Sequence, residues 1–421
     1  INSTVYGASV AVSGGKFSFS GAGVGIDLEN NIEGSTRSYI DSSDVLAGQD
    51  IEITADATGV IAKADGTAVA VSVAVSIGGA VSISATTLEN TIAMDVDSYL
   101  NLDNSRTLGV STFQVSAGNN LDVSSNADAR FNNIQATAVT VSAGLVGASG
   151  GGVDIHNQVD NKVNAKITGS GEALVGAKAT VSADETTELN IAVTNVAVSA
   201  SIGASIGVAL VRNEVKSRVN TRINNATIIA ANIDLLASVN NQIKETKAVG
   251  FSASLLAAAA NRADVDITTV VEATTDAANL SATDTIKIEA SSTNYARAQS
   301  SGGSAGAIAI GAMIADIEQG VDGTNEVVVQ IGDSSVINAG TLQMTASGDD
   351  DILAKSVAGA GGLVAAVGSQ SNATSYQAAV ANVGKGVTIN VTNLDVNAKL
   401  DQEIDASADA FSIGLLAGTG A

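Results

Sequence analysis

A short segment with alternating apolar and polar residues recurs along this 421-residue chain, and this recurrence limits the possible folds more than any other feature. Its first and third residues are mostly large and apolar, and the residue between them is polar. A period of two predicts a strand with one apolar and one wet face. The copies are IEITA (51–55), LDVSS (121–125), ATVSA (179–183), IDLLA (233–237), IKIEA (286–290), LQMTA (342–346) and LDVNA (394–398).

The spacing of these copies predicts a repeat architecture. The positions of their last residues, from Ala55 to Ala398, increase by 70, 58, 54, 53, 56 and 52. We therefore expect an all-β fold, a β-solenoid (parallel β-helix-like) built from about seven repeats of about 57 residues, with 1–421 as one continuous array. The spacing leaves open whether one repeat is one wide coil or three short coils. Small-residue bends precede several copies, at Ala47-Gly48, Ala117-Gly118, Gly176-Ala177 and Ala339-Gly340.

An Asn-x-Ile or Asn-x-Val motif forms a second recurring feature, at Asn30, Asn90, Asn157, Asn213 and Asn325. The first three intervals match one repeat each, and the interval from Asn213 to Asn325 matches two. Asparagines at equivalent positions of stacked coils can hydrogen-bond to one another along the axis, so the motif predicts a structural asparagine ladder. The alternative is that each asparagine only begins a strand after a turn.

A strip of small residues completes each unit. GTAVAVSVAVSIGGAVSISA (66–85) contains nothing larger than isoleucine, and similar strips occupy 139–152, 196–210, 249–260, 304–317 and 357–369. Small side chains let sheets or coils approach closely. Paired strips around Gly-Gly would also suit the hairpins of an outer-membrane β-barrel or of a pore-forming secreted toxin. The missing aromatic girdle argues against that alternative, and we expect no membrane insertion.

Composition disfavours several classes of function. The formal net charge is −23, so nucleic acid is not an expected partner. The chain has no cysteine and a single histidine, His156, which excludes zinc and thiol chemistry and leaves His156 a structural or neutral role. Tryptophan is absent and only five tyrosines are present, which leaves few platforms for sugar rings. A β-helix enzyme that degrades polysaccharides is therefore the less favoured alternative to a non-enzymatic protein.

Two acidic segments are the only candidates for binding calcium. Neither segment matches an EF-hand loop or the glycine-rich calcium-binding roll. We expect at most a weak calcium site, and the alternative is solvated acidic turns that keep the protein soluble. No other cofactor is expected. The candidate ligands are Asp95, Asp97 and Asp103 in the first segment and Asp349, Asp350 and Asp351 in the second.

The combined pattern resembles the repeat regions of large bacterial exoproteins, in particular filamentous-haemagglutinin-like adhesins and leukotoxin-type secreted proteins. The pattern is N-x-[IV], then [VI]-x-A-G-x-x-[IL]-x-[IV]-x-A, then a strip rich in Ala, Gly, Ser and Val. The resemblance implies a secreted or cell-surface β-solenoid that serves as a stalk, adhesive fibre or filament. The period here is longer and less even than in haemagglutinin-type coils.

The resemblance and the ends of the chain suggest its partners. The chain begins at Ile1 without a signal peptide and ends inside an apolar run at Ala421, so we expect a piece of a longer protein. Expected partners are the continuation of the same giant chain or further copies of it. A host surface or a neighbouring cell surface is a further candidate.

Overall fold

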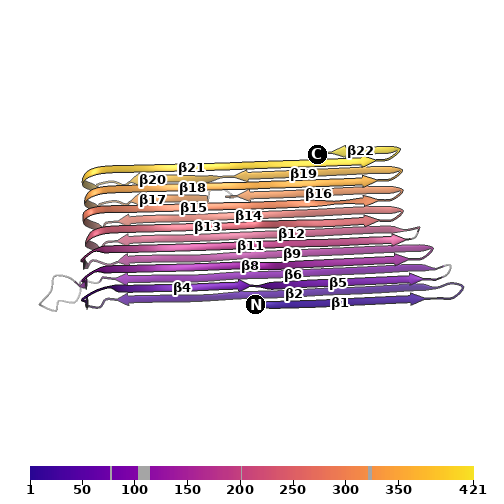
Figure 1. Ribbon diagram of the computed structural model, residues 1–421, viewed down its shortest axis with the longest axis horizontal. Helices are drawn as coiled ribbons and strands as arrows, with labels where there is room; N and C mark the ends of the chain where they lie inside the picture. The colour runs from indigo at the N-terminus through magenta and orange to yellow at the C-terminus, as the bar shows by residue number, and fades with distance from the viewer. Residues whose placement is uncertain (76–77, 103–113, 201, 321–324) are drawn as a thin grey trace.

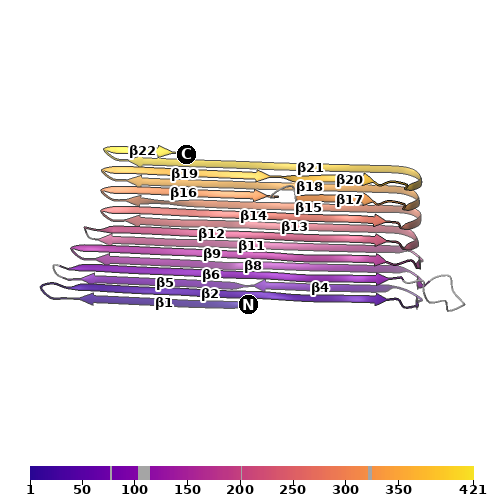
Figure 2. The same cartoon turned by 180° about the vertical axis from the view of Figure 1, so that it is seen from behind.

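Stacked parallel strands make up almost all of the protein. The computed structural model describes residues 1–75, 78–102, 114–200, 202–320 and 325–421. The strands run across the width of the molecule and rise from the N-terminus at one end to the C-terminus at the other (Figures 1 and 2). No helix in these ranges is long and apolar enough to cross a membrane.

The strands of the described residues form two sheets, here called sheet A and sheet B. Sheet A contains β1 (Asn2–Ser13), β3 (Val45–Ala47), β4 (Ile51–Ile61), β5 (Lys63–Ala74), β7 (Val115–Ala117), β8 (Asn120–Ala143), β10 (Glu172–Val175), β11 (Lys178–Ala200), β13 (Thr227–Ala253), β15 (Asn279–Ala305), β18 (Val336–Gly361) and β21 (Thr388–Ile413). Sheet B contains β2 (Phe19–Asp41), β6 (Gly79–Asn101), β9 (Val146–Thr168), β12 (Ala204–Asn224), β14 (Leu256–Asp276), β16 (Ile308–Gln319), β17 (Asn325–Ile331), β19 (Val364–Ser375), β20 (Gln377–Val383) and β22 (Leu416–Gly420).

One turn of the solenoid is a single wide coil. Each long strand of sheet A leads through a tight turn into sheet B, which crosses back to the opposite edge (Figure 1). A residue therefore pairs with one a whole repeat away: Ile51 with Leu121, and Leu342 with Leu394. The first residues of all seven recurrent segments lie in register along sheet A. Three short coils per repeat do not occur in the described residues.

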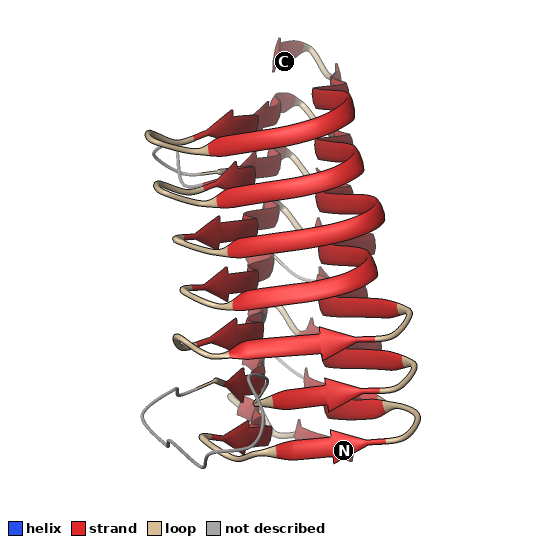
Figure 3. Ribbon diagram, turned by 90° about the vertical axis from the view of Figure 1, so that its left-hand side faces the viewer, coloured by secondary structure: helices blue, strands red, loops and turns tan. Residues whose placement is uncertain are grey.

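The edge opposite the tight turns is made by the small-residue bends. A Cβ added to Gly118 would overlap the carbonyl oxygen of Gly48, and one added to Gly176 would overlap that of Gly118. The bends stack so closely that only glycine fits at these positions. In later coils, sheet A strands continue around this corner as curved ribbons (Figure 3), and the predicted bend at Ala339-Gly340 lies inside β18.

The two sheets enclose a core that is narrow near the tight turns. There, Ala68, Ala70 and Ala80 are fully buried between the sheets. A Cβ on Gly66 would lie 2.6 Å from Thr86 Cγ2 on the opposite sheet. Larger side chains such as Phe131 fill the core farther from the turns. The small-residue strips therefore serve close sheet packing, as the sequence predicts.

Within the part of the chain that the structure describes, these strips do not form the hairpins considered from the sequence. The halves of the 66–85 strip lie in different sheets, β5 in sheet A and β6 in sheet B. Each half pairs in parallel with the matching strand of the neighbouring coils. The apparent hairpin is a crossing from one sheet to the other.

Replacing Gly176 with alanine tests the close approach of the bends. Because the new Cβ would meet a backbone oxygen that cannot rotate away, we expect Gly176→Ala to lower the free energy of unfolding by about 1–3 kcal/mol. Gly25→Ala is the matched control, because no atom lies within 4 Å of its added Cβ. Urea denaturation measures both variants, and equal stability of the two would contradict tight stacking.

Candidate functional site

Four of the predicted ladder asparagines form a hydrogen-bonded row inside sheet B. Asn30 Nδ2 donates to Asn90 Oδ1 at 2.8 Å, Asn90 to Asn157 at 2.7 Å, and Asn157 to Asn213 at 2.8 Å. The row ends when Asn213 Nδ2 donates across the core to Thr246 Oγ1. These side chains are buried, so the row supplies partners for amides that would otherwise be costly to bury.

Asn325 does not belong to this ladder, and its assignment from the sequence is wrong. The register places Val265 beside Asn213, so the row becomes apolar there. On β14, two residues lie between Ile267 and Val270. Their pairing partners on the next coil, Gln319 and Glu326, are separated by six residues. Four additional residues therefore precede Asn325 in the sequence, and in register it lies four positions beyond the ladder row, which continues through Val265 to Ile317. The double interval in the sequence hides this shift.

Asn325 instead contributes to a second buried polar row, which we call the polar seam. Its members lie on both sheets and connect by hydrogen bonds through the core. Each is buried except Gln402, which lies at the last described coil of sheet A. The seam comprises Asn161, Glu185, Ser217, Asn241, Thr269, Asn294, Asn325, Asp350 and Gln402.

Glu185 is the charged group at one end of the seam. Its Oε1 accepts hydrogen bonds from Asn161 Nδ2 at 3.0 Å, Ser217 Oγ at 3.0 Å and Thr187 Oγ1 at 3.2 Å. Its Oε2 has no hydrogen-bond partner. Burial is the largest influence and raises the pKa of Glu185 to about 7, although the three donors oppose the shift.

Asp350 is the charged group at the other end of the seam. Asn294 Nδ2 and Gln319 Nε2 donate to its Oδ1, at 3.0 and 2.7 Å. Ser375 Oγ and Gln402 Nε2 donate to its Oδ2, at 2.9 and 3.1 Å. Four neutral donors thus surround one carboxylate, which offsets much of the cost of burying it.

The six candidate calcium ligands are dispersed. Asp350 points inward, whereas Asp349 and Asp351 point outward, because side chains alternate along a strand. Asp351 pairs with Arg297, Asp95 with Arg37 and Asp97 with Lys166. Asp103 lies outside the described residues. In the described ranges, no group of three or more acidic or histidine side chains is placed to hold a metal ion.

His156 lies on the outer face of sheet B, in a shallow polar hollow of about 380 Å³. Its Nε2 is 3.9 Å from Glu214 Oε2. Arg262 bonds Asp264 on the same strand at 2.7 Å, so charges of both signs line the hollow. Burial, followed by the Asp264 charge, raises the pKa of nearby Asp266 to about 6. Three acidic residues, two arginines and His156 line the hollow, and no nucleophile with an adjacent base stands out in it.

Charged residues are almost absent from one edge of the solenoid. The edge lies where the chain leaves sheet A through a tight turn and enters sheet B. Each run of sequence there lacks Asp, Glu, Lys and Arg, apart from Lys16 in the first turn. The later runs are 66–88, 131–153, 189–211, 248–261, 298–315, 356–384 and 410–421. We call the tight turns and the adjoining outer face of sheet B the charge-free edge.

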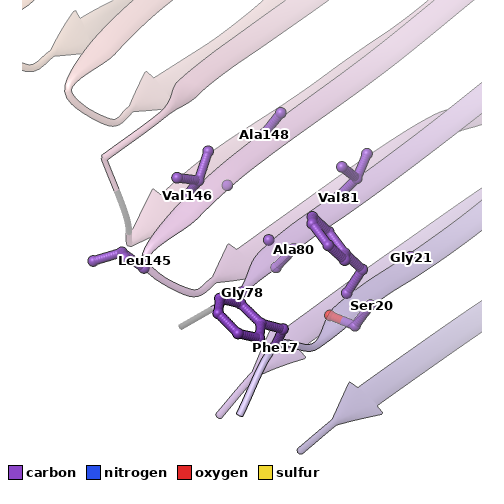
Figure 4. A pocket seen from close by; sticks show the side chains of 12 residues that line it. Phe17, Ser20, Gly21, Gly78, Ala80, Val81, Leu145, Val146 and Ala148 are labelled. Carbon is purple, nitrogen blue, oxygen red and sulfur yellow. The ribbon is translucent and has the colours of Figure 1, made fainter. Parts of the chain in front are cut away.

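Large apolar side chains are exposed along the charge-free edge. They are Phe17, Phe19, Val81, Ile83, Leu145, Val146, Ile202, Ile206, Leu255, Leu256, Ile308, Ile310, Leu363, Val364, Leu415 and Leu416. At its N-terminal end, several of them line a groove of about 700 Å³, where Phe17, Val81, Leu145 and Val146 stand around Gly21 and Gly78 (Figure 4). This edge is not among the features predicted from the sequence, although charge-free runs that recur at the repeat spacing are visible there.

These features define a class of protein, a parallel β-solenoid with two wide sheets, a polar interior row and one uncharged edge. Comparisons with protein-family models, curated proteins and solved structures find no match to this chain.

Substitution of Asn157 tests the asparagine ladder. Asn157→Val supplies the residue type that occupies this row at Val265, but it leaves Asn90 Nδ2 and Asn213 Oδ1 without their partners. We expect a loss of about 2–4 kcal/mol in the free energy of unfolding. Asn126→Val is the control, because Asn126 makes an exposed bond to Asp56, and we expect a change within about 0.5 kcal/mol. Similar losses in both variants would argue against the ladder.

The pH dependence of stability tests Glu185. Its pKa is about 7 in the folded protein and 4.5 ordinarily, so the folded state binds the proton more tightly. The contribution of this group to the free energy of unfolding therefore increases by about 3 kcal/mol as the pH falls from about 8 to 5. Glu185→Gln should be more stable than the natural chain at pH 8 and equal to it at pH 5. Glu188→Gln, on the same strand but with a partly exposed side chain, is the control, and a pH-independent difference for Glu185→Gln would refute the assignment.

Proposed function

We propose that this chain is a structural, non-enzymatic segment of an extracellular stalk, adhesive fibre or filament on a bacterial surface. In this proposal about seven repeats of about 57 residues stack into one rod. The observation that carries it is the in-register pairing of equivalent residues from coil to coil. Every added coil lengthens such a rod by about 4.8 Å and leaves its cross-section unchanged.

The direction of the hydrogen bonds between coils supports the same role. The main-chain hydrogen bonds between coils run along the axis. A force along the axis is therefore shared by all the hydrogen bonds of a wide strand at each coil. The buried asparagine ladder and the polar seam also run along the axis and link successive coils. This arrangement suits a stalk, because the bonds link successive coils along the described part of the rod.

The open faces of the terminal coils are where neighbouring coils would stack. Leu394 and Val396 of β21 are 55% and 43% exposed, whereas their register partners Leu342 and Met344 are fully buried. Further coils of the same giant chain, or other copies of it, are the partners that we propose for these faces, with a host or neighbouring cell surface as the target of the assembled fibre. In this proposal calcium acts only as a weak counter-ion of exposed carboxylates. Equal sedimentation in chelator and in millimolar calcium would exclude this role of calcium.

Immunogold electron microscopy of intact producing cells tests the location and the shape together. With antibodies raised against the purified chain, we expect gold on thin projections outside the cell envelope. The purified chain, imaged without detergent, should form rods with an axial repeat of about 4.8 Å. Labelling that appears only after the cells are opened would refute the surface role.

A further inference from the structure

The charge-free edge exposes far more apolar surface than a monomeric protein usually does. Its sixteen large side chains, each 40–85% exposed, present on the order of 1,500 Å² of mostly apolar surface. The largest apolar patch on a typical monomer is about 300–600 Å². A stable protein interface needs about 800 Å² per partner, so roughly half of this edge would suffice.

One row on this edge alternates large and small residues from coil to coil. Ile83, Ile206 and Ile310 project outward and are 57%, 54% and 52% exposed. In the same row, Gly150 lies between the first two, Ala258 between the second and third, and Ala366 beyond the third. The isoleucines therefore stand about 9.6 Å apart, two strand spacings, with a gap of similar size between them.

We propose that the charge-free edge is the interface at which a second copy of this solenoid packs side by side with the first. The isoleucines of one copy fill the gaps over Gly150, Ala258 and Ala366 of the other. A two-fold axis between two coils places each isoleucine opposite a small residue, so the row is complementary to itself. This pairing is independent of whether the chain serves as a stalk.

Spacing and charge both favour a second copy over other occupants. A partner that interlocks along the row must repeat at the same spacing of two strands, and an identical solenoid does so by construction. A fluid lipid surface gains nothing from alternating large and small residues. Each copy carries a net charge of −23, and this edge lets two copies approach without acidic groups facing each other.

Sedimentation equilibrium of the 421-residue chain tests the pairing. The variant Ile83→Lys/Ile206→Lys/Ile310→Lys should raise the dissociation constant of the dimer at least about 100-fold. The control Thr91→Lys/Gln158→Lys/Thr268→Lys adds the same charge to the other half of the outer face of sheet B and should change it by less than about threefold. A natural chain that stays monomeric at about 100 µM, or a dimer that the first variant leaves intact, would overturn the proposal.

Filling the gaps separates interlocking from general apolar adhesion. Gly150→Ile/Ala258→Ile makes the edge more apolar but removes the gaps, and an added Cβ at Gly150 meets no atom within 4 Å. We expect this variant to weaken the dimer about as much as the lysine variant does. It therefore also tests the proposal if the lysine variant fails to fold. Association as tight as that of the natural chain would refute interlocking. Flotation of a monomeric natural chain with phosphatidylcholine vesicles would assign the edge to lipid instead.

Discussion

The parallel main-chain ladder between coils is the constraint on which the rest of the structure depends. Because each strand pairs with the strand one repeat later, every coil must follow the path of the previous coil at about 4.8 Å. A single residue added within a strand would turn the following side chains inside out unless a β-bulge absorbs it. Such a shift occurs where Leu189 pairs with Ile243 but Asn190 with Glu245, and Ile191 and Ala248 beyond it remain buried. Changes in repeat length are thus tolerated where a bulge or loop restores the alternation.

Period-two alternation made much of this fold predictable from the sequence. The segments beginning at Ile51 and Leu121 align in the sequence for the same reason that they pair in space: both place apolar residues at the same inward positions. The bends at Gly118 and Gly176 were equally visible, because only glycine fits where the backbones of successive bends approach closely. The width of the coil was not predictable, because alternation identifies strands but not how many share one turn.

The polar seam was not predicted, because polar residues outside the asparagine ladder were expected to face water. Yet Asn241, Asn294, Asp350 and Gln402 each lie eight residues after the first residue of a recurrent segment, and an even offset points inward. Extending the alignment by this amount would have found the polar seam. Glu185 is harder to find, because it lies in the polar run ADETTELN and its burial depends on donors from two other strands, Asn161 on β9 and Ser217 on β12.

Register also explains why charge is confined to one part of the width. Stacking repeats each position along the axis, so acidic residues at equivalent positions become neighbours. Burial, followed by the Glu52 charge, raises the pKa of Asp122 on the adjacent coil. Cations interrupt such rows, as where Lys178 pairs with Asp234 of the next coil at 2.6 Å. In the narrow half of the coil the small-residue core leaves little apolar burial to offset such repulsion, so a row of like charges would be costly there. An uncharged edge is therefore compatible with the thin core beneath it, and the same edge is the part of the surface where two acidic rods can meet.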